Sequence, residues 1–152
     1  MNYCRTITCL ILIATFVISC VPPIDTEYVI LLKNQSNHRI DSYLGANKHF
    51  PDTTIVETNF RWSVEPEKSI GFSSTTRWEK IFEEYVPSDT LSMFVFHTDT
   101  LEANLWETII DEYKVLKRYD LSLEDIQLLN YDIPYPPTER MKDMQMYPPY
   151  EE

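Results

Sequence analysis

The residues best suited to acid–base chemistry are His97 and Asp99, which flank Thr98 directly after an apolar segment. A histidine beside a carboxylate can act as a general base that the carboxylate orients. A hydrolase would also need a nucleophile, and Ser88 and Ser92 are merely nearby in sequence, without a G-x-S-x-G turn. The alternative is a strand exit where Asp99 caps the next turn. We expect a protein that is not an enzyme, and keep a hydrolase using His97 and Asp99 as an alternative.

The spacing of the other ligand-forming residues does not match a known metal motif. His38, His49 and His97 have no second ligand three or four residues away, so a zinc site would have to be assembled through the fold. The acidic pairs do not match a calcium loop. The whole chain has two glycines, Gly45 and Gly71, which excludes a glycine-rich phosphate loop. The sequence therefore predicts no cofactor.

A group of methionines and tyrosines lies near the C-terminus. Thioethers can bind a soft copper ion, and methionine also forms adaptable contact surfaces. We favour packing of this segment against the domain, and keep partner binding as a second hypothesis for Met141, Met144, Met146, Tyr147 and Tyr150.

The N-terminal residues have the pattern of a secretory signal. Residues 7–18 are apolar apart from two threonines, and Arg5 is the only charged residue before Asp25. Twelve residues form about 18 Å of helix, which is too short for a hydrocarbon core of about 30 Å. A signal peptide is therefore favoured over a transmembrane helix.

The end of this signal indicates a lipid anchor. Val17, Ile18 and Ser19 precede Cys20 and resemble a bacterial lipobox. The resemblance implies that the Cys20 thiol receives a diacylglycerol and that residues 1–19 are removed. Two or three acyl chains give stable membrane anchoring, at about 0.8 kcal/mol per buried CH₂ group. The alternative is an ordinary signal peptide with Cys20 as an incidental thiol.

Composition excludes several classes of function. Cys4 and Cys9 would leave with the signal and Cys20 would be modified, so no disulfide, cysteine metal site or cysteine nucleophile is expected. Cleavage would also remove Arg5, so the net charge of −11 becomes −12, with 24 acidic and 12 basic residues. This charge argues against nucleic-acid binding and against electrostatic docking on anionic lipid.

Hydrophobic periodicity predicts an α+β, mostly β domain with sandwich-like antiparallel sheets and about three short helices. Strands are expected over residues 27–33, 39–44, 59–65, 68–73, 91–96, 114–119 and 131–135, and helices over residues 78–85, 104–113 and 122–129.

Particular pairings and faces follow from the pattern. Residues 39–44 are the natural hairpin partner of residues 27–33, and the nearly continuous apolar run 91–96 predicts a central strand. Trp62 shares a strand face with Phe60 and Val64, so we favour a core position for it over stacking on a sugar.

Capping residues delimit the expected helices. Thr76 with Glu79 and Ser122 with Asp125 fit capping boxes, and Pro87 would end the first helix. The second helix is expected either to start with Asn104 and Glu107 as its cap or to begin earlier, at Thr100. Its apolar face is expected to be made by Leu105, Trp106, Ile109, Ile110 and Tyr113. Pro134 confines the last strand to a sheet edge.

The expected organisation has four parts. Residues 1–19 form a lipoprotein signal peptide and residues 20–26 a lipid-anchored tether. Residues 27–135 form a single globular domain, with a loop over residues 45–53. Residues 136–152 form a Pro/Met/Tyr-rich arm that is laid on the domain or disordered.

The C-terminal part carries a resemblance to a known group. The run KRYDLSLED, followed by YPPT and MKDMQMYPPY, resembles small uncharacterised lipoproteins of Bacteroides-type bacteria. The similarity extends upstream to NQSNHRIDSYL and PDTTI, and Tyr131 stands where the group usually has tryptophan. The resemblance implies a lipid anchor and an envelope location, and it carries over no catalytic residue.

These observations lead to one functional expectation. The protein is predicted to be a non-enzymatic binding or scaffolding protein of the bacterial cell envelope, anchored through Cys20 to the outer membrane, with an envelope protein or glycan as partner. The alternative, from the acidic charge, is an inhibitor or immunity-type protein that neutralises a basic partner.

Overall fold

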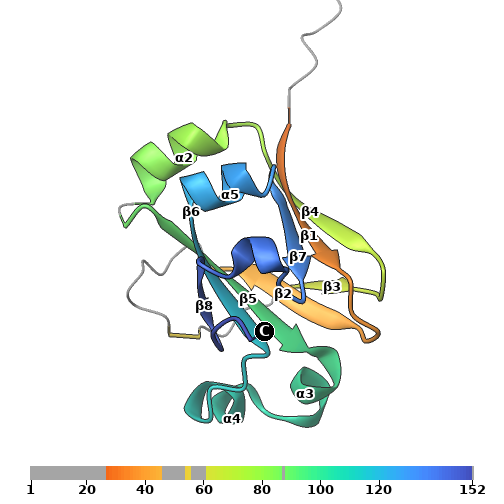
Figure 1. Ribbon diagram of the computed structural model, residues 1–152. Helices are drawn as coiled ribbons and strands as arrows, with labels where there is room; N and C mark the ends of the chain where they lie inside the picture. The colour runs from red at the N-terminus through yellow and green to blue at the C-terminus, as the bar shows by residue number, and fades with distance from the viewer. Residues whose placement is uncertain (1–26, 46–53, 56–60, 87, 152) are drawn as a thin grey trace, which may run out of the picture.

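A computed structural model describes residues 27–45, 54–55, 61–86 and 88–151 (Figure 1). The predicted signal peptide, the tether, the loop over residues 46–53, Phe60 and Pro87 lie outside the described residues. The elements follow in the order β1 (Tyr28–Asn34), β2 (Ile40–Leu44), β3 (Trp62–Val64), β4 (Ser69–Ser74), α2 (Trp78–Tyr85), β5 (Thr90–His97), α3 (Thr98–Ala103), α4 (Trp106–Asp111), β6 (Lys117–Ser122), α5 (Leu123–Leu128), β7 (Asp132–Tyr135), the 3₁₀-helix η2 (Glu139–Met141) and β8 (Gln145–Tyr147).

The strands form two sheets, which confirms the predicted fold class. A three-stranded sheet has the order β4-β1-β7, and a five-stranded sheet has the order β3-β2-β5-β6-β8. All pairs are antiparallel except β1 with β7, which is parallel. Pro134 lies on β7 at the edge of the smaller sheet, as predicted, because proline has no N–H to donate to a further strand.

The main core lies between the two sheets. Ile30 and Leu32 of β1 alternate along their strand and are fully buried, and they belong to the same cluster as Met93 and Val95 of β5. Helices α2 and α5 close one end of this core, where Trp78 and Phe82, Ile126 and Leu129 enter it (Figure 1).

A second, smaller core covers the opposite face of the five-stranded sheet. Phe94 and Phe96 of β5 point to this side and pack with Tyr43, and Leu101 of α3 and Ile109 of α4 cover them. Strand β5 is therefore buried on both faces, which explains its nearly continuous apolar sequence and confirms the prediction of a central strand.

The predicted hairpin between residues 27–33 and 39–44 is wrong. Strand β2 pairs with β3 and β5 in the larger sheet, whereas β1 pairs with β4 and β7. The Asn34 side chain explains the crossing, because its Nδ2 donates to the carbonyl oxygens of His38 and Val64 at 2.8 and 2.9 Å. These bonds direct the chain from one sheet into the other.

The two predicted capping boxes have different outcomes. Ser122 and Asp125 form the box at the start of α5. The Thr76–Glu79 box is wrong, because Arg77 occupies the N-cap position of α2 and no side chain caps it. The Glu79 carboxylate instead accepts a hydrogen bond from the Tyr131 hydroxyl at 2.9 Å.

The start and the cap predicted for the second helix are wrong, because two short helices, α3 and α4, occupy this region and Leu105 is the N-cap of α4. Asn104 ends α3, with an extended backbone and its Nδ2 donating to the Thr100 carbonyl oxygen at 2.8 Å. The next helix, α4, starts at Trp106, and Leu105 is exposed rather than part of the apolar face. Strand β6 correspondingly begins at Lys117, three residues later than predicted.

The C-terminal arm is part of the sandwich. Strand β8 adds to the larger sheet beside β6, and the Lys117 ammonium group donates to the Pro148 carbonyl oxygen at 2.8 Å. Met141 and Met144 are buried in the main core. The arm is thus laid on the domain, the first of the two states expected for it.

Candidate functional site

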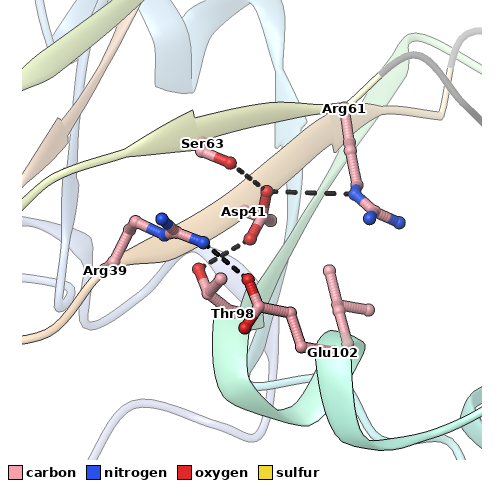
Figure 2. Close-up of a pocket in the computed structure, with 7 residues that line it drawn as sticks. Arg39, Asp41, Arg61, Ser63, Thr98 and Glu102 are labelled. Carbon is pink, nitrogen blue, oxygen red and sulfur yellow. Dashed lines mark hydrogen bonds and ion pairs between the residues drawn. The ribbon is translucent and has the colours of Figure 1, made fainter.

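A half-open polar cavity lies on the outer face of the larger sheet, at the end where β5 runs into α3. Its volume is about 280 Å³. Its walls come from two strands, from the residue before each of these strands, and from α3. The lining residues are Arg39, Asp41, Arg61, Ser63, Thr98, Leu101 and Glu102 (Figure 2).

Strand register brings the polar residues together. Asp41 of β2 lies opposite Ser63 of β3, so the two side chains leave the same face of the sheet. Arg39 and Arg61 each precede one of these strands, and Thr98 begins α3 directly after β5. Residues from distant parts of the sequence therefore meet at one sheet face.

The Asp41 carboxylate forms the floor of the cavity and is 3% exposed. Its Oδ1 accepts a hydrogen bond from the Ser63 hydroxyl at 2.5 Å, and its Oδ2 accepts one from the Thr98 hydroxyl at 2.6 Å. The guanidinium of Arg61 lies close by, with Nε 3.9 Å from Oδ1. Both carboxylate oxygens are satisfied, which suits a structural anchor for the cavity.

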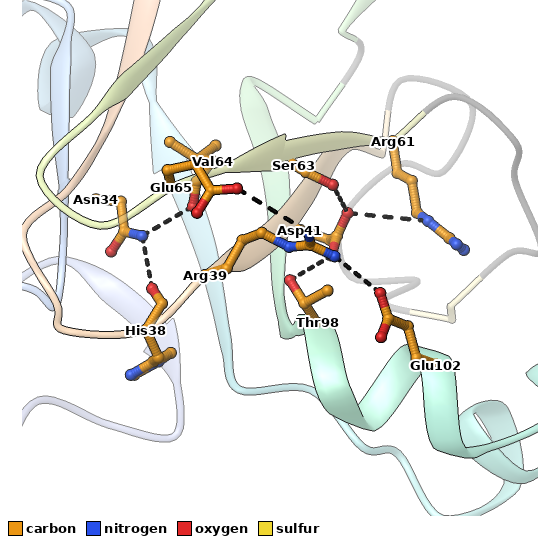
Figure 3. Close-up of polar contacts among 10 residues, drawn as sticks. All are labelled: Asn34, His38, Arg39, Asp41, Arg61, Ser63, Val64, Glu65, Thr98 and Glu102. Atoms are coloured by element: carbon orange, nitrogen blue, oxygen red, sulfur yellow. Dashed lines mark hydrogen bonds and ion pairs between the residues drawn. The ribbon is translucent and has the colours of Figure 1, made fainter.

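Arg39 is held at the cavity rim by two acidic residues. Its Nη2 lies 2.8 Å from Glu102 Oε1, and its Nη1 lies 4.0 Å from Glu65 Oε1 (Figure 3). The turn before it is fixed by Asn34, whose bonds to His38 and Val64 appear in the same view. The start of β2, and with it Arg39, is thereby positioned.

The structure places His97 beside another histidine. The rings of His38 and His97 stack with centroids 4.7 Å apart, and Tyr135 contacts His38 edge-on. His97 Nδ1 lies 3.8 Å from Asp99 Oδ2, but the Asp99 side chain is 87% exposed. The predicted pair is therefore adjacent, with Asp99 in solvent and His97 half-buried against His38.

The two serines considered as nucleophiles are bonded elsewhere. The Ser92 hydroxyl donates to Asp120 Oδ1 at 2.7 Å, and the Ser88 hydroxyl donates to the Thr90 carbonyl oxygen at 3.4 Å. Thr98, between His97 and Asp99 in sequence, belongs to the Asp41 cavity.

The predicted partner-binding residues divide into buried and accessible groups. Met141 and Met144 are buried, and Met146 packs against the core from a half-buried position. Tyr147 is 46% exposed and contacts Tyr113 edge-on, and Tyr150 is half-buried. Of the five predicted partner-binding residues, only the two tyrosines and Met146 are accessible at the surface. Cys20 and His49 lie outside the described residues.

Sequence reasoning missed the cavity itself. Asp41, Ser63 and Thr98 are ordinary polar residues in weakly patterned segments, and only the pairing of β2 with β3 and β5 brings them together. Trp62 was expected in the core and is 40% exposed, because β3 is a three-residue strand at the edge of the sheet. Its ring packs edge-on against Phe72.

Fold and site together define a two-sheet β domain with a charged cavity on one sheet face. No protein-family model, curated protein or solved structure matches the chain.

Over the residues that the structure describes, no three His, Cys, Asp or Glu side chains are grouped as metal ligands. In the same ranges, no helix has the length and apolarity needed to span a bilayer.

Protonation of His38 is expected to make stability depend on pH. Burial lowers the pKa of His38 and the neighbouring His97 lowers it further, while Asp99 acts in the opposite direction. In the unfolded chain a histidine has a pKa of about 6.5, so the unfolded state binds the proton more readily. Stability from this group is complete above that pH and falls as the pH drops through it.

We therefore expect the thermal unfolding midpoint to fall between pH 7.5 and pH 5, and His38→Gln to reduce that fall. Calorimetry of both proteins across this range measures the difference, and comparison with wild type separates His38 from titrating carboxylates. An equal fall in both proteins would contradict the prediction.

Proposed function

We propose that the protein is a lipid-anchored, non-enzymatic binding protein of the bacterial cell envelope. The observation that carries the proposal is the sequence Val17-Ile18-Ser19-Cys20 at the end of an apolar segment. The first strand begins at Tyr28, eight residues after Cys20, so a short tether would hold the domain close to the membrane.

The binding role is supported by the nature of the cavity. Its one buried carboxylate, Asp41, is fully hydrogen-bonded, whereas the guanidinium groups of Arg39 and Arg61 are partly exposed at its rim. Two accessible guanidinium groups beside a carboxylate that hydrogen bonds hold in place form an arrangement suited to ligand recognition. A domain of this kind would present the cavity to an envelope component while the lipid holds it in place.

The anchor is tested by replacing Cys20 with alanine. We expect wild type to fractionate with salt-washed membranes, to start at Cys20 and to carry the mass of a diacylglycerol, because several acyl chains hold a protein stably in a bilayer. Cys20→Ala is expected to lose that mass and leave the membrane fraction. Fractionation and intact-protein mass spectrometry measure both properties.

Cys9→Ala provides the matched control, since Cys9 lies within the predicted signal and should be removed with it. This variant is expected to behave as wild type. A wild-type protein without added lipid mass, or a Cys20→Ala protein that stays in the membrane, would contradict the anchor.

A further inference from the structure

The Asp41 cavity concentrates arginine in an acidic chain. Five arginines follow residue 19, and two of them, Arg39 and Arg61, line this one cavity. Their side chains are 42% and 43% exposed, so both guanidinium groups are accessible. Such a placement, in a chain with 24 acidic residues, points to an anionic ligand.

Arg61 has donors available for such a ligand. Within the described residues its recorded partner is Asp41, at 3.9 Å from Nε, which is longer than a hydrogen bond. Both carboxylate oxygens of Asp41 already accept hydrogen bonds, from the hydroxyls of Ser63 and Thr98. Figure 2 shows the two terminal nitrogens of Arg61 directed away from Asp41. They can therefore donate to a second acceptor.

Arg39 is already engaged with a carboxylate that can be displaced. Glu102 Oε1 accepts from Arg39 Nη2 at 2.8 Å, and the Glu102 side chain is 63% exposed. Exposed ion pairs contribute little to stability, so rotation of Glu102 into solvent costs little. The contact with Glu102 also shows that the Arg39 guanidinium can donate to a carboxylate at this position.

We propose that this cavity binds the carboxylate end group of a ligand between Arg39 and Arg61, and that Glu102 competes with it for Arg39. This proposal deepens the binding role proposed above and rests on it. The planar guanidinium fork matches a carboxylate, to which it can donate two parallel hydrogen bonds.

Charge and size narrow the ligand class. With Glu102 turned outward, the lining keeps two arginines and one aspartate, and Glu65 stays 4.0 Å from Arg39 at the rim. The cavity can therefore balance at most a single negative charge, which disfavours a phosphate dianion. The volume of about 280 Å³ lies at the lower limit of small-molecule pockets, about 300 Å³. The buried side chain of Leu101 offers an apolar contact for the carbon chain next to the carboxylate.

The test is a titration of the full chain, purified in neutral detergent, with N-acetylglycine at constant ionic strength. Arginine Nε–Hε NMR signals report the binding. We expect the Arg39 and Arg61 signals to shift and saturate, and the signal of Arg77, an exposed arginine paired with Glu79, to stay in place. The uncharged N-acetylglycinamide is expected to cause no shift.

Variants separate the roles of the residues. Glu102→Gln removes the competitor and should bind more tightly, by up to about fivefold, the upper limit that an exposed ion pair allows. Arg61→Ala should bind at least about tenfold more weakly, because a charge-assisted pair is lost. Arg77→Ala is the matched control and should bind as wild type. Circular dichroism checks that each variant is folded.

Three results would overturn the proposal. The first is an NMR shift at Arg77 equal to those at Arg39 and Arg61, which would indicate an adventitious ion only. The second is binding of inorganic phosphate at least as tight as that of N-acetylglycine. The third is an unchanged affinity of Glu102→Gln for N-acetylglycine. The mass of the N-terminal peptide, measured on the same sample, reports separately on the lipid anchor. Failure of carboxylate binding and failure of the anchor are therefore distinguishable.

Discussion

Replacing Asp120 with alanine is expected to lower the free energy of unfolding by about 3–5 kcal/mol. The Asp120 side chain has no exposed surface, and its Oδ2 lies 2.8 Å from Arg118 Nε. The Arg118 side chain is itself only 12% exposed and lies against the rings of Tyr113 and Tyr147. The variant would leave this guanidinium buried without its carboxylate, which costs far more than one lost hydrogen bond.

Chemical denaturation of wild type and variants measures this loss. Asp143→Ala is the matched control, because Asp143 is exposed on the C-terminal arm, and it should change stability by less than about 0.5 kcal/mol. Ser92→Ala, which removes the hydroxyl that donates to Asp120, should cost about 1 kcal/mol.

The double variant Arg118→Met, Asp120→Leu tests the reason for the loss. Since the cost arises from an uncompensated cation, removal of both charges should recover part of the stability lost in Asp120→Ala. A loss in Asp120→Ala no larger than that in Asp143→Ala would contradict the prediction. So would a double variant that is less stable than Asp120→Ala.

Local signals in the sequence were sufficient for much of the secondary structure. The capping box of Ser122 and Asp125 was correct because it depends only on residues three positions apart. The apolar run of β5 was correct because a strand buried on both faces has no polar alternation. The Thr76–Glu79 box failed although its spacing is the same, because α2 begins one residue later, with Arg77 at the N-cap position, and the Glu79 carboxylate accepts from Tyr131 instead.

Strand partners could not be predicted in the same way. A hairpin between residues 27–33 and 39–44 is the shortest connection, yet the side chain of Asn34 bonds to Val64 and directs the chain into the other sheet. Turn residues signal a reversal but not which sheet the next strand joins. The error in pairing also hid the candidate site, since the Asp41 cavity exists only because β2 lies between β3 and β5.

The C-terminal arm illustrates the limit of compositional reasoning. Its proline, methionine and charge content, without periodicity, fits both an ordered arm and a disordered one. The structure places two methionines of the arm in the main core, Met141 in η2 and Met144 directly before β8. Whether a segment packs is decided by the apolar surface that the rest of the domain leaves for it, and the sequence of the segment does not contain that information.

Replacing Met141 with alanine should therefore lower the free energy of unfolding by about 2–5 kcal/mol, the range for truncating a large buried side chain. Met141 is fully buried in the cluster that joins the two sheets. The shortened side chain would leave a cavity and lose its contacts with that cluster. Denaturation followed by tryptophan fluorescence measures the loss, and limited proteolysis shows whether the arm is cut first.

Gln145→Ala is the matched control, because Gln145 is exposed on the same arm, and it should change stability by less than about 0.5 kcal/mol. If the arm is part of the cooperative unit, Met141→Ala should unfold in one transition at lower denaturant concentration. A loss as small as that of Gln145→Ala, or a separate early transition confined to residues 136–152, would mean that the arm detaches by itself. In that case the sandwich would be stable without it, and the arm's tyrosines would be free to bind a partner.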